Sequence, residues 1–393
     1  MALKVAIIAG EPSGDMQAAG LIKALKEQSS EPIEFMGIGS EQMAREGFKS
    51  SYNMDILSVG GFGIDVILAI PRIYLLYKQI TKKIIEFQPD VFIGVDAPDF
   101  NFHVEKKLKE HGVKTVHYIS PTIWAWRYER IFKIKKTTDL MLCIFPMEEE
   151  LYIKENIKAK FIGNPLADKI ELNIDKNKYR HGLLSNSSLN SNKNLNINEY
   201  TTIFTILVGS RKAEIKRLAH IFIKACNIIA KRIVDCVFLF PFAKNSTYNA
   251  FLNIINSGIE VDFQYKVLLD LTDKAIKASD LVLTKSGTVT LEVALCKKPM
   301  IISYKVSRLT EWILRHKLKI KYVGQPNILL DEEVVKELLQ DEATAENLAN
   351  EMLNLYNDKK RQDYIISRFY ELHHLLKHDA SNIAAKTILE FIG

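Results

Sequence analysis

Two stretches in the second half of the chain combine glycine, hydroxyl and cationic side chains in an order typical of anion binding. Residues 207–215 read Leu-Val-Gly-Ser-Arg-Lys-Ala-Glu-Ile, an apolar run followed by a glycine turn and a helical pattern. Gly209 and Ser210 would form the turn, and the Arg211 guanidinium can hold two phosphate oxygens at once. The alternative interpretation is a helix that is capped by Ser210 and carries solvated cations.

The second stretch, residues 284–292, reads Thr-Lys-Ser-Gly-Thr-Val-Thr-Leu-Glu and again places small residues between an apolar run and a helical pattern. The N–H groups of Gly287 and Thr288, with the hydroxyls of Ser286 and Thr288, can bind a diphosphate at the positive end of a helix. Glu292, one to two turns into that helix, can accept two hydrogen bonds from a ribose diol. Two such loops favour a nucleotide or nucleotide-sugar site in this half of the chain.

Carboxylates take the corresponding places in the first half. Residues 94–101, Gly-Val-Asp-Ala-Pro-Asp-Phe-Asn, follow an apolar run, so Asp96 and Asp99 fall where a strand ends. Asp96 in that position can act as a general base that removes a proton from a hydroxyl group. The alternative is that Asp96 or Asp99 serves a turn or caps a helix.

Two further loops of the first half have unusual side chains. Residues 10–15, Gly-Glu-Pro-Ser-Gly-Asp, lie between a strand pattern and a helix pattern, as in a phosphate-binding turn, yet Glu11 and Asp15 would repel a phosphate. Residues 120–127, Ser-Pro-Thr-Ile-Trp-Ala-Trp-Arg, place two tryptophans after another strand pattern. These rings can line a sugar or acyl site, or they can pack in the core.

One helical segment is more apolar than a helix with one solvated face needs to be. Within residues 61–79 three polar positions, Asp65, Arg72 and Gln79, are seven residues apart and form a narrow stripe. The apolar stretches are shorter than the ~20 residues of a membrane span, so the helix is either buried between others or a surface for acyl chains and the membrane. Pro71 is expected to begin a new helical segment. The residues predicted for acyl or membrane contact are Val66, Ile67, Leu68, Ile70, Ile73, Leu75 and Leu76.

Buried strands are needed to position these loops, and apolar runs alternate with helical patterns along the chain. This alternation predicts an α/β fold with parallel sheets flanked by helices, in which active sites lie at the carboxyl ends of the strands. The asparagine-rich residues 185–198 are predicted to be a surface loop or a disordered insertion. The runs interpreted as strands are 4–9, 91–95, 115–119, 140–144, 202–208, 237–240, 281–284 and 300–303.

Length and composition exclude several classes of protein. A chain of 393 residues suits two domains, and its net charge of +6 comes without a basic run interleaved with aromatics, so nucleic-acid binding has little support. The four scattered cysteines predict reduced thiols in a cytosolic protein, and the start of the chain leads into a strand without a signal peptide. Neither His-Glu-x-x-His nor an Asp-x-Asp box occurs, so we expect no metal and no cofactor.

Taken together, these stretches resemble the lipid-A-disaccharide synthase family. The resemblance rests on motifs that occur in family order over nearly the whole chain. They are residues 9–15, 94–101, 120–127, Gly-Asn-Pro-Leu-Ala-Asp (163–168), 209–215, 286–292, Pro-Met-Ile-Ile-Ser-Tyr (299–304) and Gln-Pro-Asn-Ile-Leu (325–329).

The resemblance implies two Rossmann-like domains that face each other across a cleft, the glycosyltransferase B architecture. It implies an inverting, metal-independent transfer from UDP-2,3-diacylglucosamine to 2,3-diacylglucosamine 1-phosphate, giving the β-1,6-linked disaccharide 1-phosphate and UDP. It also implies work at the cytoplasmic face of the inner membrane, with membrane contact through the apolar helix, and allows a homodimer.

Roles for individual residues follow from the same resemblance. Asp96 would be the base, and Arg211 and Asn327 would be the other catalytic residues, with Asn327 near the donor. Glu11, Ser13, Gly14 and Asp99 would lie on the acceptor side, where the charge of the acidic loop is no obstacle. UDP would be held by Gly209, Ser210, Arg211, Ser286, Gly287, Thr288 and Glu292.

Two positions depart from the family pattern, and two other functions stay open. Val208 stands where the family has proline, and Gln325 stands where it has leucine; neither change removes a proposed catalytic side chain. The alternatives are another UDP-sugar enzyme of the same architecture, such as a peptidoglycan glycosyltransferase or a UDP-N-acetylglucosamine 2-epimerase, and a membrane-surface binding protein without catalysis.

We predict four parts along the chain. Residues 1–165 would form the domain for the acceptor and the membrane, and 166–200 a linker with the asparagine-rich insertion. Residues 201–357 would form the UDP-sugar-binding domain, and 358–393 a helical tail that packs on either domain.

Overall fold

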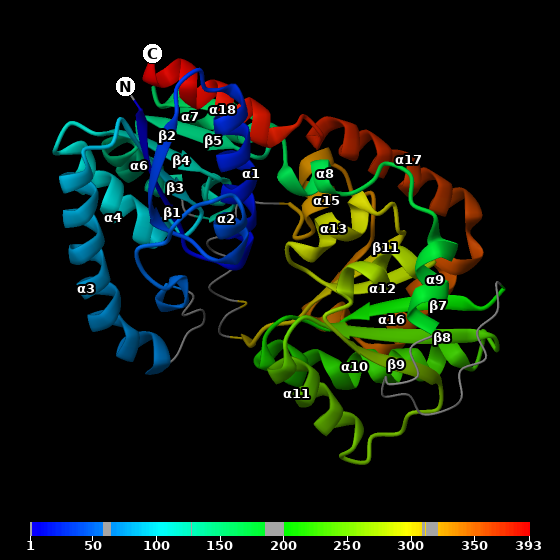
Figure 1. Cartoon of the computed structure of the whole chain (residues 1–393). Coiled ribbons are helices and arrows are strands. Elements are labelled where there is room, and N and C mark those ends of the chain that lie inside the picture. The colour runs from blue at the N-terminus through cyan, green and yellow to red at the C-terminus, as the bar shows by residue number, and fades with distance from the viewer. Residues whose placement is uncertain (1, 58–63, 127, 185–199, 309–310, 312–320) are drawn as a thin grey trace. The chain divides into compact units, whose positions relative to one another are not determined.

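The structure is a computed structural model that describes all residues except 1, 58–63, 127, 185–199, 309–310 and 312–320 (Figure 1). It divides into two compact units. Unit 1 consists of Met1–Lys169 and Leu376–Gly393, and unit 2 of Ile170–Leu375. The predicted asparagine-rich loop lies outside the described residues.

Unit 1 is built on a parallel sheet whose strand order is β2-β1-β3-β4-β5-β6. Its strands are β1 (Leu3–Ala9), β2 (Ile33–Ile38), β3 (Val91–Val95), β4 (Lys114–Tyr118), β5 (Leu140–Cys143) and β6 (Lys158–Phe161). Its helices are α1 (Pro12–Gln28), α2 (Glu41–Arg45), α3 (Ile64–Phe87), α4 (Pro98–Lys109), α5 (Ile123–Trp126), α6 (Ile131–Thr137), α7 (Pro146–Lys154), α8 (Pro165–Lys169) and α18 (Ala380–Ile392).

Unit 2 has a second parallel sheet, with the strand order β12-β11-β10-β7-β8-β9. Its strands are β7 (Thr202–Leu207), β8 (Cys236–Phe242), β9 (Gln264–Leu269), β10 (Leu281–Lys285), β11 (Met300–Tyr304) and β12 (Glu337–Leu339). Its helices are α9 (Lys176–Leu184), α10 (Lys212–Ala230), α11 (Asn245–Ile255), α12 (Thr272–Ala278), α13 (Val289–Leu295), α15 (Gln325–Leu330), α16 (Ala345–Asn357) and α17 (Lys359–Leu376).

The structure confirms the predicted strands. They could be predicted because most of their residues are buried and apolar. Every residue of β3, β7 and β8 is buried, as expected for central strands of a parallel sheet covered by helices on both sides. Sequence analysis missed β2, β6, β9 and β12, which carry more polar residues or are shorter. Each of these four lies at or next to an edge of its sheet, where burial on both faces is not required.

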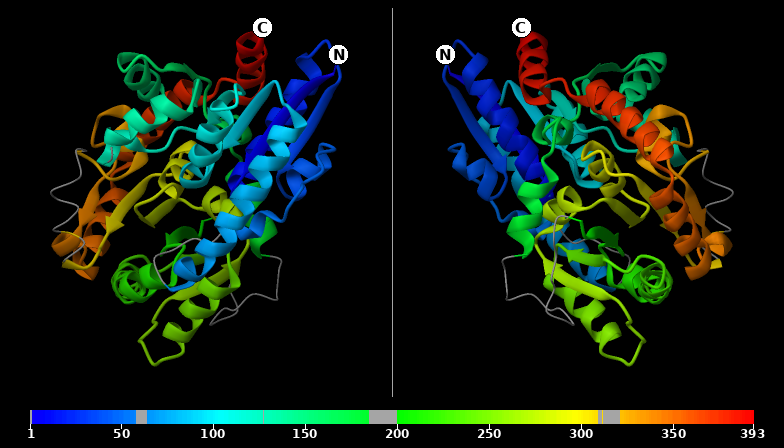
Figure 2. Two further views of the ribbon diagram at one scale, coloured as in Figure 1. Left: turned by 90° about the vertical axis from the view of Figure 1, so that its left-hand side faces the viewer. Right: turned by 90° about the vertical axis from the view of Figure 1, so that its right-hand side faces the viewer.

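The predicted C-terminal tail is divided between the two units. Helix α17 belongs to unit 2 apart from its last residue, whereas α18 packs on α1 in unit 1 (Figure 2). Asp168 holds the start of α18, since its carboxylate accepts the N–H groups of Asp379 at 2.9 Å and Ala380 at 2.6 Å. The end of the chain therefore completes the core of unit 1, to which Ala384, Ala385 and Ile388 contribute.

Helix α3 differs from the prediction at Pro71, which lies inside one continuous helix and does not begin a new one. A proline inside a helix removes one backbone hydrogen bond and costs about 3 kcal/mol. Beyond Pro71 the helix is attached to the core through Leu76, Ile80 and Ile84, which are buried at four-residue spacing. We attribute the continuity of the helix to this burial, which offsets the cost of the proline.

Candidate functional site

The candidate residues of unit 1 meet where the order of its strands reverses. The sheet runs β2-β1 in one direction and β3-β4-β5-β6 in the other, so the switch point lies between β1 and β3. Ala9 at the end of β1 pairs with Val95 at the end of β3, and Val95 pairs with Tyr118 at the end of β4. The loops that follow these strands therefore lie together, at the place where open α/β sheets bind ligands.

Asp96 begins the loop after β3 in a conformation that the surrounding structure enforces. Asp96 and Ala97 both have left-handed backbone angles, with φ of +52° and +43°. Such residues cost about 1–3 kcal/mol each and concentrate at functional sites. The Asp96 N–H donates to the Tyr118 carbonyl at 2.9 Å, and Asn101 Nδ2 donates to the Asp96 carbonyl at 2.8 Å and the Ile8 carbonyl at 3.3 Å.

Asn101 is thus a positioning residue that sequence analysis recognised only as part of a motif. Its side chain is fully buried and joins the end of β1 to the loop that carries Asp96. An asparagine three residues after a proline at a helix start is a weak signal, because a surface helix can carry one there as well. Only its burial identifies its task.

The acidic segment at residues 10–15, which the structure shows as a short turn followed by the first turn of α1, lies directly against Asp96 and Ala97. A Cβ atom at Gly10 would be 2.4 Å from the Cβ of Ala97, so this close approach requires glycine. Gly14 is buried beside Val95 and Asp96, whereas Glu11 and Ser13 are exposed. The structure thus brings Glu11, Ser13 and Gly14 to the same switch point as Asp96.

Asp15, the second carboxylate of this loop, has a structural task. It is buried, and its oxygens accept the N–H groups of Ser40 at 2.6 Å and Gln42 at 2.9 Å, which lie at the start of α2. A carboxylate at the positive end of a helix is favourable. This segment therefore has one exposed carboxylate, Glu11, and uses the other inside the fold.

Asp99 differs from Asp96 in its surroundings. Its side chain is 87% exposed and forms an ion pair with Arg130 at 3.1 Å. Asp96, in contrast, is half-buried and its backbone is held by Asn101 and Tyr118; its role as the base stays a prediction. The predicted acceptor contact of Asp99 stays a prediction.

The tryptophan loop after β4 is held by a buried carboxyl group that sequence analysis missed. Trp124 Nε1 donates to Glu148 Oε1 at 3.2 Å, and the Phe145 N–H donates to Glu148 Oε2 at 3.2 Å. Ser120 in the same loop bonds the Tyr152 hydroxyl at 2.9 Å. The side chain of Trp126 lies outside the described part of the chain.

Burial raises the pKa of Glu148 to about 8, despite the N–H and O–H groups that stabilise its charge. A raised carboxyl pKa means that the folded protein binds a proton which the unfolded chain has released above about pH 4.5. This contribution to stability is therefore present below pH 4.5 and is lost as the pH rises towards 8.

We accordingly expect the free energy of unfolding of the wild type to fall relative to that of Glu148→Gln between pH 5 and pH 8. The slope should be at most about 1.4 kcal/mol per pH unit, the value for one proton. Urea unfolding at several pH values measures it. Parallel curves for the two proteins would show that Glu148 does not titrate in this range.

Unit 2 has its own switch point, between β7 and β10. The order β9-β8-β7 runs one way and β10-β11-β12 the other, and Leu207 at the end of β7 pairs with Thr284 near the end of β10. The two predicted anion loops follow these two strands. Tertiary structure thus brings residues 209–215 and 286–292 to one place, as predicted from two separate motifs.

The first anion loop is shaped by Glu214. Gly209 has φ of +140°, and a Cβ atom there would lie 2.7 Å from Glu214 Oε2. That oxygen accepts the N–H groups of Ser210 at 3.0 Å and Arg211 at 3.3 Å. The side chains of Ser210 and Arg211 remain exposed, so the Arg211 guanidinium is available to a ligand.

Lys285 joins the two anion loops, and sequence analysis did not select it. Its Nζ lies 2.9 Å from Glu214 Oε1 and 5.5 Å from the centre of the Tyr304 ring. Partial burial alone would raise the pKa of Glu214, but Lys285 and the two N–H groups outweigh it, so this pKa lies below its ordinary value. The ion pair is therefore formed at neutral pH, with its cation next to Gly287.

The second anion loop uses part of its hydrogen-bonding capacity internally. The Ser286 hydroxyl donates to the Val323 carbonyl at 2.8 Å, and the Ser286 N–H donates to Ser303 at 2.9 Å. The predicted contact of this hydroxyl with a diphosphate would have to replace the first bond. Thr288 is exposed and Glu292 is half-buried, and their predicted ligand contacts stay predictions.

Asn327 is fully buried and does not present its amide to a ligand. Its Nδ2 donates to the Val335 carbonyl at 2.8 Å and to Glu337 Oε1 at 2.9 Å, and its Oδ1 accepts the Val335 N–H at 3.0 Å. Glu337 also accepts the N–H groups of Val323 at 2.9 Å and Gly324 at 2.9 Å. These contacts favour a positioning role over the predicted catalytic one.

The two departures from the family pattern lie inside this framework. Val208 is buried at the end of β7. The Gln325 N–H donates to Thr290 Oγ1 at 3.2 Å, which ties the start of α15 to α13.

The apolar face of α3 is exposed over part of the predicted contact surface. Ile70 is 57% exposed, Tyr74 55% and Leu75 56%, and Ile73 is half-buried. Leu76 differs from the prediction, because it is 3% exposed and packs in the core of unit 1. The side chains of Val66, Ile67 and Leu68 lie outside the described part of the chain. In that part, no helix is long and apolar enough to cross a membrane.

Comparison with solved structures assigns the class of fold. The structure is similar to UDP-GlcNAc 2-epimerase from Neisseria meningitidis bound to UDP-GlcNAc, with a TM-score of 0.65 and 13% identity over 99% of this chain and 100% of that one. It is also similar to the glycotransferase of kitacinnamycin, with a TM-score of 0.64 and 10% identity over the full length of both. The fold is the two-unit α/β architecture of B-type glycosyltransferases and epimerases.

Sequence comparison assigns the family. The family model for lipid-A-disaccharide synthetase matches residues 5–388. The chain is 40% identical to the lipid-A-disaccharide synthase of Chromobacterium violaceum over 99% of this chain and 97% of that one. The identity to the synthase of Vibrio campbellii is also 40%, over 99% and 98%. The chain belongs to the lipid-A-disaccharide synthase family and is a glycosyltransferase of lipid A disaccharide synthesis.

Proposed function

We propose that the protein transfers 2,3-diacylglucosamine from UDP-2,3-diacylglucosamine to the 6-hydroxyl of 2,3-diacylglucosamine 1-phosphate, with inversion at the anomeric carbon. The observation that carries this proposal is family membership over residues 5–388. It is supported by a carboxylate loop at the switch point of unit 1 and two cationic loops at the switch point of unit 2.

Asp96 is the proposed base. Its carboxylate takes the proton of the acceptor 6-hydroxyl while that oxygen forms the new bond to the donor anomeric carbon. The bond from that carbon to the UDP oxygen breaks in the same step, and the electron pair leaves with UDP. The hydrogen bonds from Asn101 and to Tyr118 hold the left-handed backbone from which the Asp96 side chain extends.

The loops of unit 2 are proposed to hold UDP and to stabilise the charge that grows on its diphosphate. Arg211 supplies a bidentate cation, and the N–H groups of Gly287 and Thr288 point from a helix start. We add Lys285, since its ammonium group lies beside Gly287 and is held there by Glu214. Glu292 holds the ribose, and Asn327 keeps the 324–335 segment in place.

The experiment that tests this function measures UDP release in detergent from UDP-2,3-diacylglucosamine, with and without the diacylated acceptor, in the presence of EDTA. Acceptor-dependent release that resists EDTA is expected. Release with a water-soluble acceptor alone would point to another UDP-sugar enzyme of the same architecture. Donor binding without any release would point to a binding protein without catalysis.

Membrane contact is proposed for the exposed apolar face of α3. We expect Ile70→Asp with Leu75→Asp to weaken binding to phospholipid vesicles by more than about 10-fold, because burying each such side chain contributes about 1.5–3 kcal/mol. Co-sedimentation with vesicles measures this. Val234→Asp is the matched control, since Val234 is 92% exposed and lies in unit 2. Equal binding of all three proteins would exclude this face.

A further inference from the structure

Unit 2 contains a pocket at the amino ends of its strands, whereas its switch point lies at their carboxyl ends. The pocket has a volume of about 330 Å³ and lies at the amino ends of β7, β10 and β11. It is therefore separate from the loops proposed to bind UDP, which follow the carboxyl ends of the same strands. Its volume is in the range of small-molecule sites.

The residues that line this pocket carry a large excess of positive charge. Asp280 is the one carboxylate among its described lining residues. Its cationic lining residues are Lys176, Arg180, Lys297, Lys298 and Lys359.

Three of these cations are buried. Arg180 pairs with Asp280. Lys297 donates to the Glu171 carbonyl at 3.2 Å and contacts His373 Nδ1. Lys298 is the buried cation whose hydrogen bond goes to a neutral carbonyl. Arg180 is 4% exposed, and Lys297 and Lys298 are each 8% exposed. Buried charges without counter-charges are strongly unfavourable, and proteins normally pair them or place them against a ligand. A solvated face of surface lysines would carry no such cost.

Asp280 cannot balance this charge, because it is already fully engaged. Its carboxylate accepts Arg180, Lys176 at 2.9 Å and the Ile203 N–H at 2.9 Å. Lys298 instead donates to the carbonyl of Ser279 at 2.8 Å. Burial lowers the pKa of Lys298 to about 8, although the negative charge of Asp280 acts in the opposite direction.

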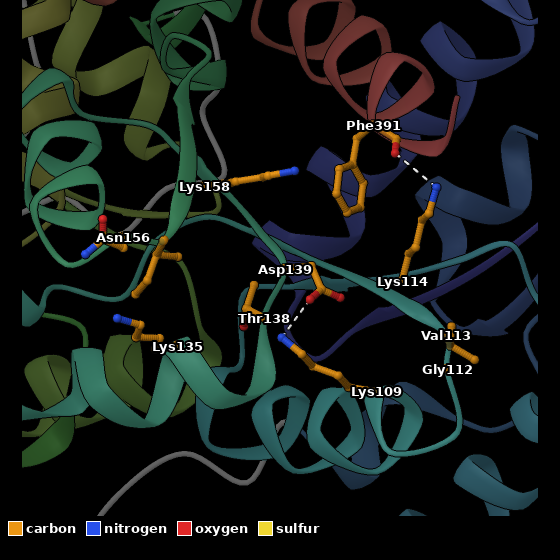
Figure 3. Close-up of a pocket in the computed structure, with 11 residues that line it drawn as sticks. Lys109, Gly112, Val113, Lys114, Lys135, Thr138, Asp139, Asn156, Lys158 and Phe391 are labelled. Atoms are coloured by element: carbon orange, nitrogen blue, oxygen red, sulfur yellow. Dashed lines mark hydrogen bonds and ion pairs between the residues drawn. The ribbon is translucent and has the colours of Figure 1, made fainter.

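A second lysine-lined hollow, in unit 1, shows the contrast (Figure 3). It is larger, about 560 Å³, and also lies at amino ends of strands. Lys109 pairs with Asp139 at 2.6 Å, and Lys114 donates to the carbonyls of Phe391 at 3.2 Å and Ile392 at 2.7 Å. Lys135 and Lys158 are exposed to water. None of the lysines that line this hollow is buried, whereas three of the cations that line the pocket of unit 2 are.

We propose that the pocket at the amino ends of β7, β10 and β11 binds a phosphate group, in which Lys298 and Lys359 contact the phosphate oxygens. The ligand is a phosphate or a phosphate ester, either free in solution or as the headgroup of a lipid. Binding there is independent of the glycosyl transfer proposed above, so each can fail without the other.

Inorganic phosphate is the probe, titrated calorimetrically into the full-length protein with UDP at saturation so that the donor loops are occupied. We expect one further site, at least about 10-fold weaker in Lys359→Met and in Lys298→Met, as for loss of one charged hydrogen bond. Lys135→Met, in the hollow of unit 1, is the control and should bind as the wild type does. Lys359 is exposed, so its variant tests the site even if Lys298→Met does not fold.

Vesicles of phosphatidylcholine with phosphatidylglycerol separate the two sources of phosphate. Weaker binding of Lys359→Met to these vesicles, with competition by inorganic phosphate, would assign a lipid headgroup. Unchanged vesicle binding together with the loss of phosphate binding would assign a free phosphate compound. The proposal is overturned if the UDP-saturated wild type shows no phosphate binding, or if all three variants bind phosphate as the wild type does.

Discussion

Replacement of Asp96 by asparagine is expected to lower kcat by about 10²- to 10⁴-fold, the usual contribution of a positioned general base. Asparagine has nearly the same shape and tolerates left-handed backbone angles, so the loop after β3 should keep its conformation. The substitution therefore removes the proton acceptor and little else. Single-turnover UDP release, with the donor and the diacylated acceptor both saturating, measures the chemical step.

Asp99→Asn is the matched control for this substitution. Asp99 lies three residues further on, in the first turn of α4, but it is exposed and paired with Arg130. We expect its replacement to change the KM for the acceptor more than kcat. If Asp99→Asn lowers kcat as strongly as Asp96→Asn, or if Asp96→Asn keeps kcat within a factor of a few, Asp96 is not the base.

The second large effect is expected at Arg211. Arg211→Ala should lower kcat/KM for the donor by about 10²- to 10³-fold, since it removes a charge-assisted donor from the developing negative charge of UDP. Arg211→Lys should recover part of this loss, because it restores the charge without the bidentate geometry. Glu214 caps the loop through main-chain N–H groups, so neither substitution removes the contacts that shape it.

Lys212→Ala is the control for Arg211, since Lys212 is the exposed neighbouring cation at the start of α10. It should leave kcat/KM nearly unchanged, because exposed charges at a distance are screened by salt. UDP binding measured by calorimetry should follow the same order as kcat/KM. Equal losses in Arg211→Ala and Lys212→Ala would mean that the loop contributes only general positive charge, and would contradict a specific clamp.

The structure also shows that residues of one motif differ in their contacts. In the loop at residues 10–15, Asp15 caps α2 while Glu11 is exposed beside the Asp96 loop. In the segment at 325–329, Asn327 is turned into the fold and bonded to Glu337. A motif records which residue types a family needs, but it does not distinguish contact with substrate from support of the loop that makes the contact.

The sequence by itself determined the α/β class, the parallel central strands and the family. Strands buried on both faces are continuous apolar runs, and this signal is local, so β3, β7 and β8 could be predicted from their own residues. The loops that carry Asp96, Arg211 and Thr288 could be predicted as well, because glycine, small and charged residues after such runs mark the carboxyl ends of strands.

Only the tertiary structure decided which side chains meet. Glu148 bonds to Trp124 across 24 residues, and Lys285 at the end of β10 pairs with Glu214 in the first turn of α10. The basic pocket of unit 2 is lined by cations from residue 176 to residue 359. The burial of Lys298 could not be predicted from the local sequence either. The same holds for the division of the C-terminal tail, in which α18 completes the core of unit 1. The physical reason is that periodicity reports the environment of a residue's own element, whereas ion pairs, buried charges and pockets depend on which elements the topology brings together.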